Sequence, residues 1–174
     1  MGHGCTQGSG TLVAADRTAT HRPHVLIVTS DESLRDFLAE GLVYGGFWTS
    51  VIASGLQVLE VFRLRTFDLM LIDAALGGLG SLEVVRRLRG RSAREGQAPP
   101  RTDIPIVVIA ADPSEIDAGE AAASGADEIV LAPLDLETLV PHLHQIIARW
   151  RAEHPGRPWA DELAQRPDAG AASK

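Results

Sequence analysis

The sequence predicts an α/β protein in which helices cover both faces of a doubly wound, five-stranded parallel sheet. Three features of the chain support this fold class. Apolar runs alternate with segments of helical periodicity, the apolar runs are continuous, and turn or capping residues separate the two kinds of segment. Continuous apolar runs are typical of parallel strands because such strands are buried on both faces.

Five short runs rich in valine, isoleucine and leucine mark the expected strands. They are residues 24–29, 48–53, 68–73, 104–110 and 127–131. A segment with helical periodicity follows each run, at residues 31–45, 55–66, 81–90, 113–124 and 135–150. The predicted order is therefore (βα)5.

Capping residues indicate where the helices begin and end. Ser30 and Asp135 precede acidic first turns and are expected to cap the first and last helices, and Gly125 is expected to end the fourth. Pro141 falls inside the last helix, where it removes a backbone donor, so we expect a kink or a shortened helix there. Residues 90–103 contain two adjacent prolines and are expected to form a loop.

Length and composition fit one domain with flexible ends. The chain has 174 residues, 45% of them hydrophobic, which is enough for a single packed core. Residues 1–22 and 151–174 lack apolar periodicity, so we expect disordered arms around a domain at 23–150. No apolar run approaches the ~20 residues of a membrane span, which predicts a soluble, cytoplasmic protein that does not bind membranes. The single cysteine, Cys5, excludes an internal disulfide.

Charge is unevenly distributed along the chain. The formal net charge of −7 argues against a nucleic-acid partner. Between residues 112 and 148 there is no lysine or arginine, and the acidic residues are Asp112, Glu115, Asp117, Glu120, Asp127, Glu128, Asp135 and Glu137. Between residues 86 and 101 arginines gather around one glutamate, and they are Arg86, Arg87, Arg89, Arg91, Arg94 and Arg101. The pattern predicts one acidic and one basic end of the domain.

The sequence does not predict an enzyme or a metal site. No cysteine, serine or threonine is placed with a base and an orienting acid, as a catalytic nucleophile requires. His142 and His144 are two positions apart on a helix and therefore point to different faces. The glycine-rich stretch at residues 77–81 lacks the pattern of a nucleotide-binding loop.

The residues that leave the strands resemble a known family. In doubly wound sheets, ligands and chemistry lie at the carboxyl ends of the strands. VLIV with DESLRDFLAEGL, then FDLMLIDAALGGLGSLEVVRRLR, IPIVVIAAD and ASGADEIVLAPLDLETL resemble, in order and spacing, the receiver domain of two-component response regulators. The resemblance covers residues 24–149 and implies a flavodoxin-like (CheY-like) fold with strand order 2-1-3-4-5.

The resemblance implies a phosphorylation site. Receivers carry two adjacent acids after strand 1, a phosphoacceptor aspartate ending strand 3, a hydroxyl residue ending strand 4 and a lysine before proline after strand 5. The acids and the acceptor hold Mg²⁺, which prefers hard oxygen ligands, while the lysine and the metal neutralise the phosphoryl group. Asp73 falls on the phosphoacceptor position.

Six positions depart from the receiver pattern. Two uncharged residues replace the acid pair, an aspartate is displaced into the next helix, alanines stand at the hydroxyl and lysine positions, and an isoleucine replaces the switch aromatic. In that order, these residues are Thr29, Ser30, Asp31, Ala110, Ala132 and Ile129. Loss of the carboxylates and the lysine removes the charges that would hold Mg²⁺ and a phosphoryl group.

Asp73 therefore has two interpretations. Its carboxylate can accept hydrogen bonds from backbone N–H groups of the following loop, which is a structural role. Alternatively, it can accept a phosphoryl group, and Mg²⁺ is an expected cofactor in that case only.

Together these features predict an atypical, pseudo-receiver-like, stand-alone receiver that signals through protein–protein contacts in a two-component or phosphorelay pathway. The resemblance implies that the fourth helix, fifth strand and fifth helix bind a signalling partner, such as a histidine kinase, or a second copy of the chain. The expected contact residues are Asp112, Glu115, Asp117, Glu120, Asp127, Glu128 and Glu137. Two alternatives stay open, a phosphorylatable single-domain regulator that accepts a phosphoryl group from a histidine kinase at Asp73, and a small-ligand sensor.

Overall fold

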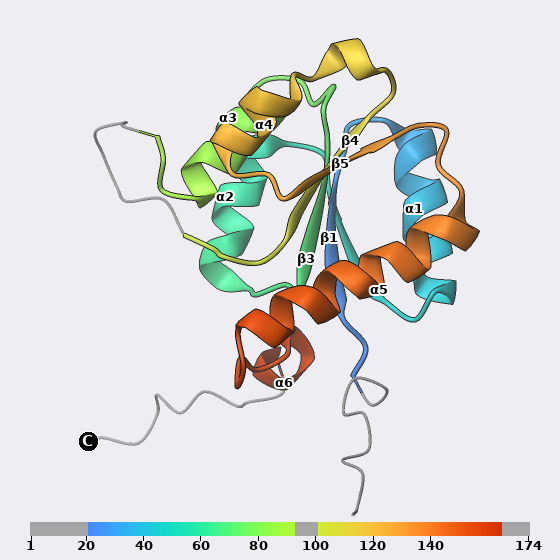
Figure 1. Ribbon diagram of the computed structural model, residues 1–174, viewed down its shortest axis with the longest axis vertical. Helices are drawn as coiled ribbons and strands as arrows, with labels where there is room; N and C mark the ends of the chain where they lie inside the picture. The colour runs from blue at the N-terminus through green and yellow to red at the C-terminus, as the bar shows by residue number, and fades with distance from the viewer. Residues whose placement is uncertain (1–20, 93–100, 165–174) are drawn as a thin grey trace, which may run out of the picture.

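The computed structural model describes residues 21–92 and 101–164, and strands and helices alternate along them (Figure 1). The elements are β1 (His24–Val28), α1 (Glu32–Tyr44), β2 (Trp48–Ile52), α2 (Gly55–Leu64), β3 (Leu69–Asp73), α3 (Ser81–Leu88), β4 (Ile106–Ala110), the short 3-10 helix η2 (Pro113–Glu115), α4 (Ala118–Ser124), β5 (Glu128–Leu131), α5 (Leu136–Glu153) and α6 (Ala160–Ala164). Most of the predicted N-terminal arm, the centre of the loop after α3 with Arg94, and the last ten residues lie outside the described residues.

The five strands form one parallel sheet in the order β2-β1-β3-β4-β5. Every residue of the central strands β3 and β4 is buried, whereas the edge strands β2 and β5 are partly exposed. The predicted doubly wound (βα)5 fold is confirmed. All carboxyl ends of the strands consequently meet at one edge of the sheet and all amino ends at the opposite edge.

Alternate strand residues pack into two hydrophobic cores, one on each face of the sheet. On one face Leu42 of α1 and Leu143 of α5 are fully buried against the strands. On the other face Val58, Val84 and Ala121 bring α2, α3 and α4 against the sheet. Burial of apolar side chains on both faces explains why the strand sequences are continuous apolar runs.

The start of α1 differs from the prediction. Asp31, not Ser30, caps this helix, because its Oδ1 accepts the backbone N–H groups of Ser33 at 2.7 Å and Leu34 at 3.0 Å. Serine and aspartate are both good capping residues. Because Ser30 and Asp31 are adjacent, the sequence alone does not decide which of them caps the helix.

The predicted helix at residues 113–124 is interrupted. Asp112 caps η2 through the N–H of Ser114, and Asp117 caps α4 through the N–H of Glu120 at 2.7 Å, so the segment has two helix starts. Gly125, with φ +105°, ends α4 as predicted, because the left-handed region favours glycine.

The last long helix, α5, is not shortened by its proline. Asp135 caps it as predicted, and the helix continues through Pro141 to Glu153. Pro141 lies on the exposed side of the helix, where its ring does not disturb the core. Within the described parts of the chain, no helix has the length and apolar character needed to cross a membrane.

The prediction of a disordered tail from residue 151 is wrong for residues 151–164. This part of the chain extends α5, turns back and forms α6, and we call residues 154–164 the C-terminal strap. Trp159 and Ala160 of the strap are buried in the core, with Arg151 3.5 Å above the indole ring and His21 stacked on it at 5.1 Å. One tryptophan among prolines and charged residues gives no periodicity, so the sequence pattern did not reveal the strap.

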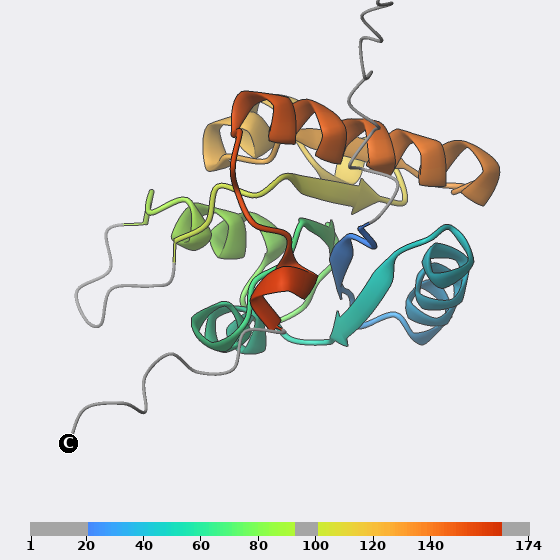
Figure 2. The ribbon, with the colours of Figure 1, turned by 90° about the horizontal axis from the view of Figure 1, so that it is seen from below.

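The strap lies across the amino ends of the strands (Figure 2). Asp68, which is 4% exposed, holds it in place. The Asp68 carboxylate accepts the N–H groups of Ala160 at 3.3 Å and His24 at 2.8 Å, and Arg151 lies 3.5 Å from it. Burial raises the pKa of Asp68 above its ordinary value of 3.8, against the lowering effect of these hydrogen bonds and of Arg151.

Candidate functional site

A hollow of about 410 Å³ lies at the carboxyl edge of the sheet. It is lined by residues at or just after the ends of strands and at the start of α1, and they are Ser30, Asp31, Leu34, Asp73, Ala75, Ile109, Ala111 and Ala132. The structure therefore brings together four of the positions singled out in the sequence. Chemistry in doubly wound sheets occurs at this edge, which makes the hollow the candidate signalling site.

Thr29 and Asp73 form a hydrogen-bonded pair beside the hollow. Thr29 is 1% exposed at the end of β1, and Asp73 is 8% exposed at the end of β3. The Thr29 hydroxyl donates to Asp73 Oδ2 at 2.7 Å. A hydroxyl donor thus stands where a receiver places a carboxylate, and a short hydrogen bond replaces repulsion between like charges.

The backbone donors around the hollow are also bound by the chain itself. The N–H of Ala75 donates to Asp73 Oδ1 at 2.9 Å, which is the loop contact expected for a structural aspartate. The N–H of Asp31 donates to Thr29 Oγ1 at 3.0 Å, and the N–H of Ala111 donates to Glu115 Oε2 at 2.8 Å. An incoming phosphoryl group would have to displace Asp73 or Glu115 to reach the Ala75 or Ala111 donor.

Three of the positions that depart from the receiver pattern carry only apolar side chains. Ala110 is fully buried at the end of β4, and Ile129 of β5 packs against the core formed with α2, α3 and α4. Ala132 lines the hollow and precedes Pro133 through a cis peptide bond. None of the three offers a hydroxyl, an amine or an aromatic ring to a phosphoryl group.

The residues at this edge do not fit the Mg²⁺ that receivers bind. The displaced acid, Asp31, uses Oδ1 to cap α1, and Asp73 Oδ2 is taken by the Thr29 hydroxyl. Across the described residues there is no group of three or more His, Cys, Asp or Glu side chains arranged to hold a metal. Mg²⁺ needs several hard oxygen ligands in near-octahedral geometry, so we derive no chemistry through it here.

Three of the predicted partner-binding acids are paired within the domain. Glu120 lies 2.8 Å from Arg86, Asp127 lies 2.7 Å from Arg89, and Glu128 contacts a histidine and an arginine of α5. The sequence predicted one acidic and one basic end of the domain. This prediction is wrong, because the acidic and basic segments contact each other. They meet because α3 packs beside α4, which sequence distance conceals.

The remaining acids lie beyond the carboxyl ends of β4 and β5, at the same edge of the sheet as the hollow, and none of them lines it. They follow β4 or β5, none has a basic partner among the described residues, and we call them the acidic rim: Asp112, Glu115, Asp117, Asp135 and Glu137. Three of them, Asp112, Asp117 and Asp135, cap helix N-termini, where negative charge is stabilised. The carboxyl edge of the sheet consequently carries concentrated negative charge.

The sheet order, the aspartate ending β3 and the hollow beside it define a receiver-type α/β domain. The chain matches the family model described as the response regulator receiver domain over residues 25–144. It belongs to the response regulator receiver domain family, a family of signalling domains in two-component systems.

Curated relatives are longer proteins. The chain is 31% identical over 149 residues to the transcriptional regulatory protein CseB of Streptomyces avermitilis, covering 84% of this chain and 58% of that protein. It is 33% identical over 130 residues to the DNA-binding response regulator MtrA of Mycolicibacterium smegmatis, covering 75% of this chain and 53% of that protein. The chain spans about half the length of the curated relatives it matches.

Solved structures agree on the fold. The chemotaxis response regulator CheY4 of Vibrio cholerae superposes with a TM-score of 0.61 at 23% identity, covering 72% of this chain and 99% of that chain. A sensor protein from Polaromonas sp. JS666 gives a TM-score of 0.61 at 28% identity, covering 75% of this chain and 99% of that chain.

Proposed function

We propose that this chain is an atypical receiver that signals by binding a protein partner, without phosphorylation of Asp73. The observation that carries this proposal is the 2.7 Å hydrogen bond from the Thr29 hydroxyl to Asp73 Oδ2. A phosphoacceptor oxygen has to be free to attack phosphorus and needs cationic groups around it. At Asp73 one oxygen is held by Thr29, the other accepts the N–H of Ala75, and no described residue is a lysine.

The proposed partner is a protein with a basic surface that docks on the acidic rim, in a two-component or phosphorelay pathway of the cytoplasm. Negative charge without a basic counterpart repels itself, and a basic partner relieves this repulsion and associates faster. A histidine kinase is one candidate, and a second copy of this chain is disfavoured at the rim because both surfaces would be acidic.

Phosphorylation is tested by incubating the protein with acetyl phosphate and Mg²⁺ and measuring the intact mass. We expect no phosphoryl adduct under conditions that label a receiver with a complete acid pair. Asp73→Asn is the control that assigns any adduct to this side chain. An adduct that disappears in Asp73→Asn would overturn the proposal and establish the phosphorylatable regulator instead.

Partner docking is tested by charge reversal on the rim. The partner is first identified by cross-linking and then purified by itself. The double variant Glu115→Lys, Glu137→Lys should associate with it more slowly at low salt, and the effect should be smaller at high salt because ions screen exposed charges. The matched control reverses two exposed acids elsewhere, Glu40 on α1 and Glu60 on α2. Equal association rates for the rim variant and the control variant would place the interface elsewhere.

A further inference from the structure

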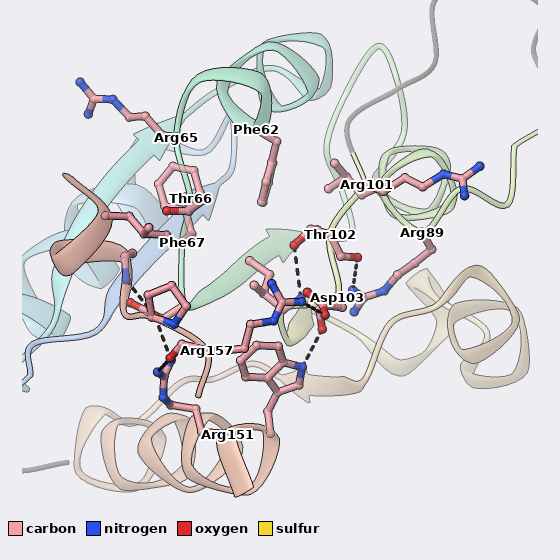
Figure 3. A pocket seen from close by; sticks show the side chains of 17 residues that line it. Phe62, Arg65, Thr66, Phe67, Arg89, Arg101, Thr102, Asp103, Arg151 and Arg157 are labelled. Carbon is pink, nitrogen blue, oxygen red and sulfur yellow. Dashed lines mark hydrogen bonds and ion pairs between the residues drawn. The ribbon is translucent and has the colours of Figure 1, made fainter. Parts of the chain in front are cut away.

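A second hollow lies at the amino edge of the sheet, opposite the candidate signalling site (Figure 3). It is bounded by the end of α2, by the residues before β4, and by the chain from the end of α5 to α6. Its volume is about 440 Å³. Small-ligand pockets typically measure roughly 300–1,000 Å³, so a metabolite fits this space.

The lining of this hollow is basic, although the chain as a whole is acidic. Two aspartates, Asp68 and Asp103, line it. The arginines that line it are Arg65, Arg89, Arg101, Arg151 and Arg157. An excess of guanidinium groups in a chain with a formal net charge of −7 points to an anionic ligand.

Two of these arginines have structural roles. Arg89 donates to the carbonyls of Gly125 and Thr102 and to Asp127. Arg151 lies over the Trp159 ring and beside Asp68. Both side chains are largely buried, so they position the walls and are not free to turn toward a ligand.

Two other arginines have no acid or carbonyl partner among the described residues. Arg65 and Arg101 lie on opposite sides of the hollow, and their guanidinium groups point outward in Figure 3. The Arg101 side chain passes so close to Gly90 that a Cβ there would lie 2.6 Å from its Nε. Both residues are exposed, and long exposed side chains reorient at little cost.

Arg157 already binds an anion within the chain. It pairs with the Asp103 carboxylate, and its guanidinium lies 5.7 Å from the centroid of the Trp150 ring. The Arg157 side chain is 49% exposed and that of Asp103 is 45% exposed. Exposed ion pairs contribute little stability, so a ligand anion can replace this carboxylate.

Aromatic side chains complete the wall. Phe62 of α2 and Trp150 of α5 are half-buried and line the hollow, and the Trp150 ring is stacked on His154 at 4.3 Å. The Trp150 Nε1–H is held by the carbonyl of Asp103 at 2.7 Å, which fixes the indole. Fixed rings beside guanidinium groups suit a ligand that combines a planar ring with an anion.

We propose that this hollow binds a nucleoside monophosphate, with the phosphate between Arg157 and Arg101 and the base against Phe62 and Trp150. The site lies at the opposite edge of the sheet from Asp73, so it stands or falls independently of the proposed signalling function. The ion pair of Arg157 with Asp103 already joins the strap to the segment before β4, and binding would replace it with a phosphate held by Arg157 and Arg101.

The binding test is isothermal titration of the full chain with AMP, GMP, CMP and UMP, with tryptophan fluorescence as a second readout. We expect at least one nucleotide to bind at least tenfold more tightly than its nucleoside or inorganic phosphate. No binding of any nucleotide at millimolar concentration would overturn the proposal. Equal affinity for inorganic phosphate would also overturn it, because the rings would then contribute nothing.

Variants test the location of the nucleotide. Arg101→Gln and Arg157→Gln should each weaken binding at least fivefold, whereas Asp103→Asn should strengthen it severalfold because it frees Arg157. Arg35→Gln, on α1, is the matched control and should bind like the parent. Circular dichroism and melting temperature confirm that each variant is folded. Loss of binding in Asp73→Asn, or unchanged binding in both arginine variants, would place the nucleotide elsewhere.

Discussion

The two edges of the sheet use their polar groups in opposite ways. At the carboxyl edge, Thr29 and Asp73 bind each other or the nearby backbone, while the acids of the rim, including Glu115, have no basic partner in the described part of the chain. At the amino edge, buried Asp68 fixes the strap, while Arg65 and Arg101 have no acidic partner within residues 21–92 and 101–164 and lie beside a hollow.

The proposed function implies that this domain keeps the receiver fold without phosphorylation of Asp73. The central strands, both cores and the sheet order are those of a receiver. The side chains that depart from the pattern lie at or near the carboxyl ends of the strands, and the two that touch a core, Ala110 and Ile129, are apolar and pack there. Function in this fold depends on the side chains at the edges of the sheet, so the function of one edge can change without changing the other edge.

The largest expected effect comes from rebuilding the carboxyl edge. Thr29→Asp with Ser30→Asp should create Mg²⁺ binding and lower the free energy of unfolding without metal by on the order of 4 kcal/mol. The loss has two causes, removal of the hydrogen bond to Asp73 and repulsion between buried carboxylates. Metal titration and urea unfolding with and without Mg²⁺ measure both effects. A variant that binds Mg²⁺ no better than the parent would show that more than these two side chains separates this edge from a working receiver.

Removing the anchor of the amino edge should have the next largest effect. Asp68→Ala deletes the acceptor for the Ala160 and His24 N–H groups and leaves Arg151 without its carboxylate. We expect a loss of about 3 kcal/mol, because breaking a buried pair leaves its partners unsatisfied. Urea unfolding reports the stability, and tryptophan fluorescence, to which Trp159 contributes along with Trp48 and Trp150, reports the release of the strap. Full stability with unchanged fluorescence would mean that packing of Trp159 alone holds the strap.

The free energy of unfolding should depend on pH through a group at the amino edge, His24. Burial, and next the positive charge of Arg65, hold the pKa of His24 below its ordinary value of 6.5. A lowered histidine pKa stabilises the fold above pH 6.5, and this stabilisation is lost as the pH falls through the lower pKa of the folded state. His24→Gln should therefore flatten the decrease in stability on acidification, by less than the effect of Asp68→Ala. Parallel pH profiles for parent and variant would assign the acid sensitivity to another group.

The smallest effect is expected between the two edges, on the exposed surface of α3 and α4. Arg86→Gln breaks the 2.8 Å pair with Glu120, in which both side chains are about one-third exposed or more. We expect a change below about 0.5 kcal/mol, since water and salt screen such pairs. Differential scanning calorimetry is the suitable measurement. A larger loss would show that this surface pair does more than an ordinary exposed one.

The fold was predictable because strands that are buried on both faces of a sheet have continuous apolar sequences, which can be recognised directly in the chain. The order of elements, the cap at Asp135 and the helix end at Gly125 all depend on local sequence. The interrupted α4 and the cap at Asp31 were not resolved, since serine, aspartate and proline each allow more than one start.

The site was predictable in position and in one contact, the backbone N–H of Ala75 that Asp73 accepts, but not in its other contacts. Asp73 was recognised from its place in the chain, whereas the donation from Thr29 depends on two strands lying side by side. The pairing of Glu120 with Arg86 and the clustering of Arg65, Arg101 and Arg157 likewise join segments distant in sequence. The only sequence signal for this contact was a threonine directly after the first predicted strand. Its role as a donor to Asp73 became clear only from the register of β1 against β3.

The strap also bears on the order of folding. His21 stacks on Trp159, so the first and last described segments of the chain meet, and contacts between such distant segments form only after a large loop has closed. The strap is short and its hydrogen bonds lie at the edge of the sheet, so it is expected to open in native-state fluctuations that leave the strands intact. The amide of Ala160 should accordingly exchange with solvent faster than the amides of β3, and the chain should pass through a form in which the sheet is complete and the strap is loose.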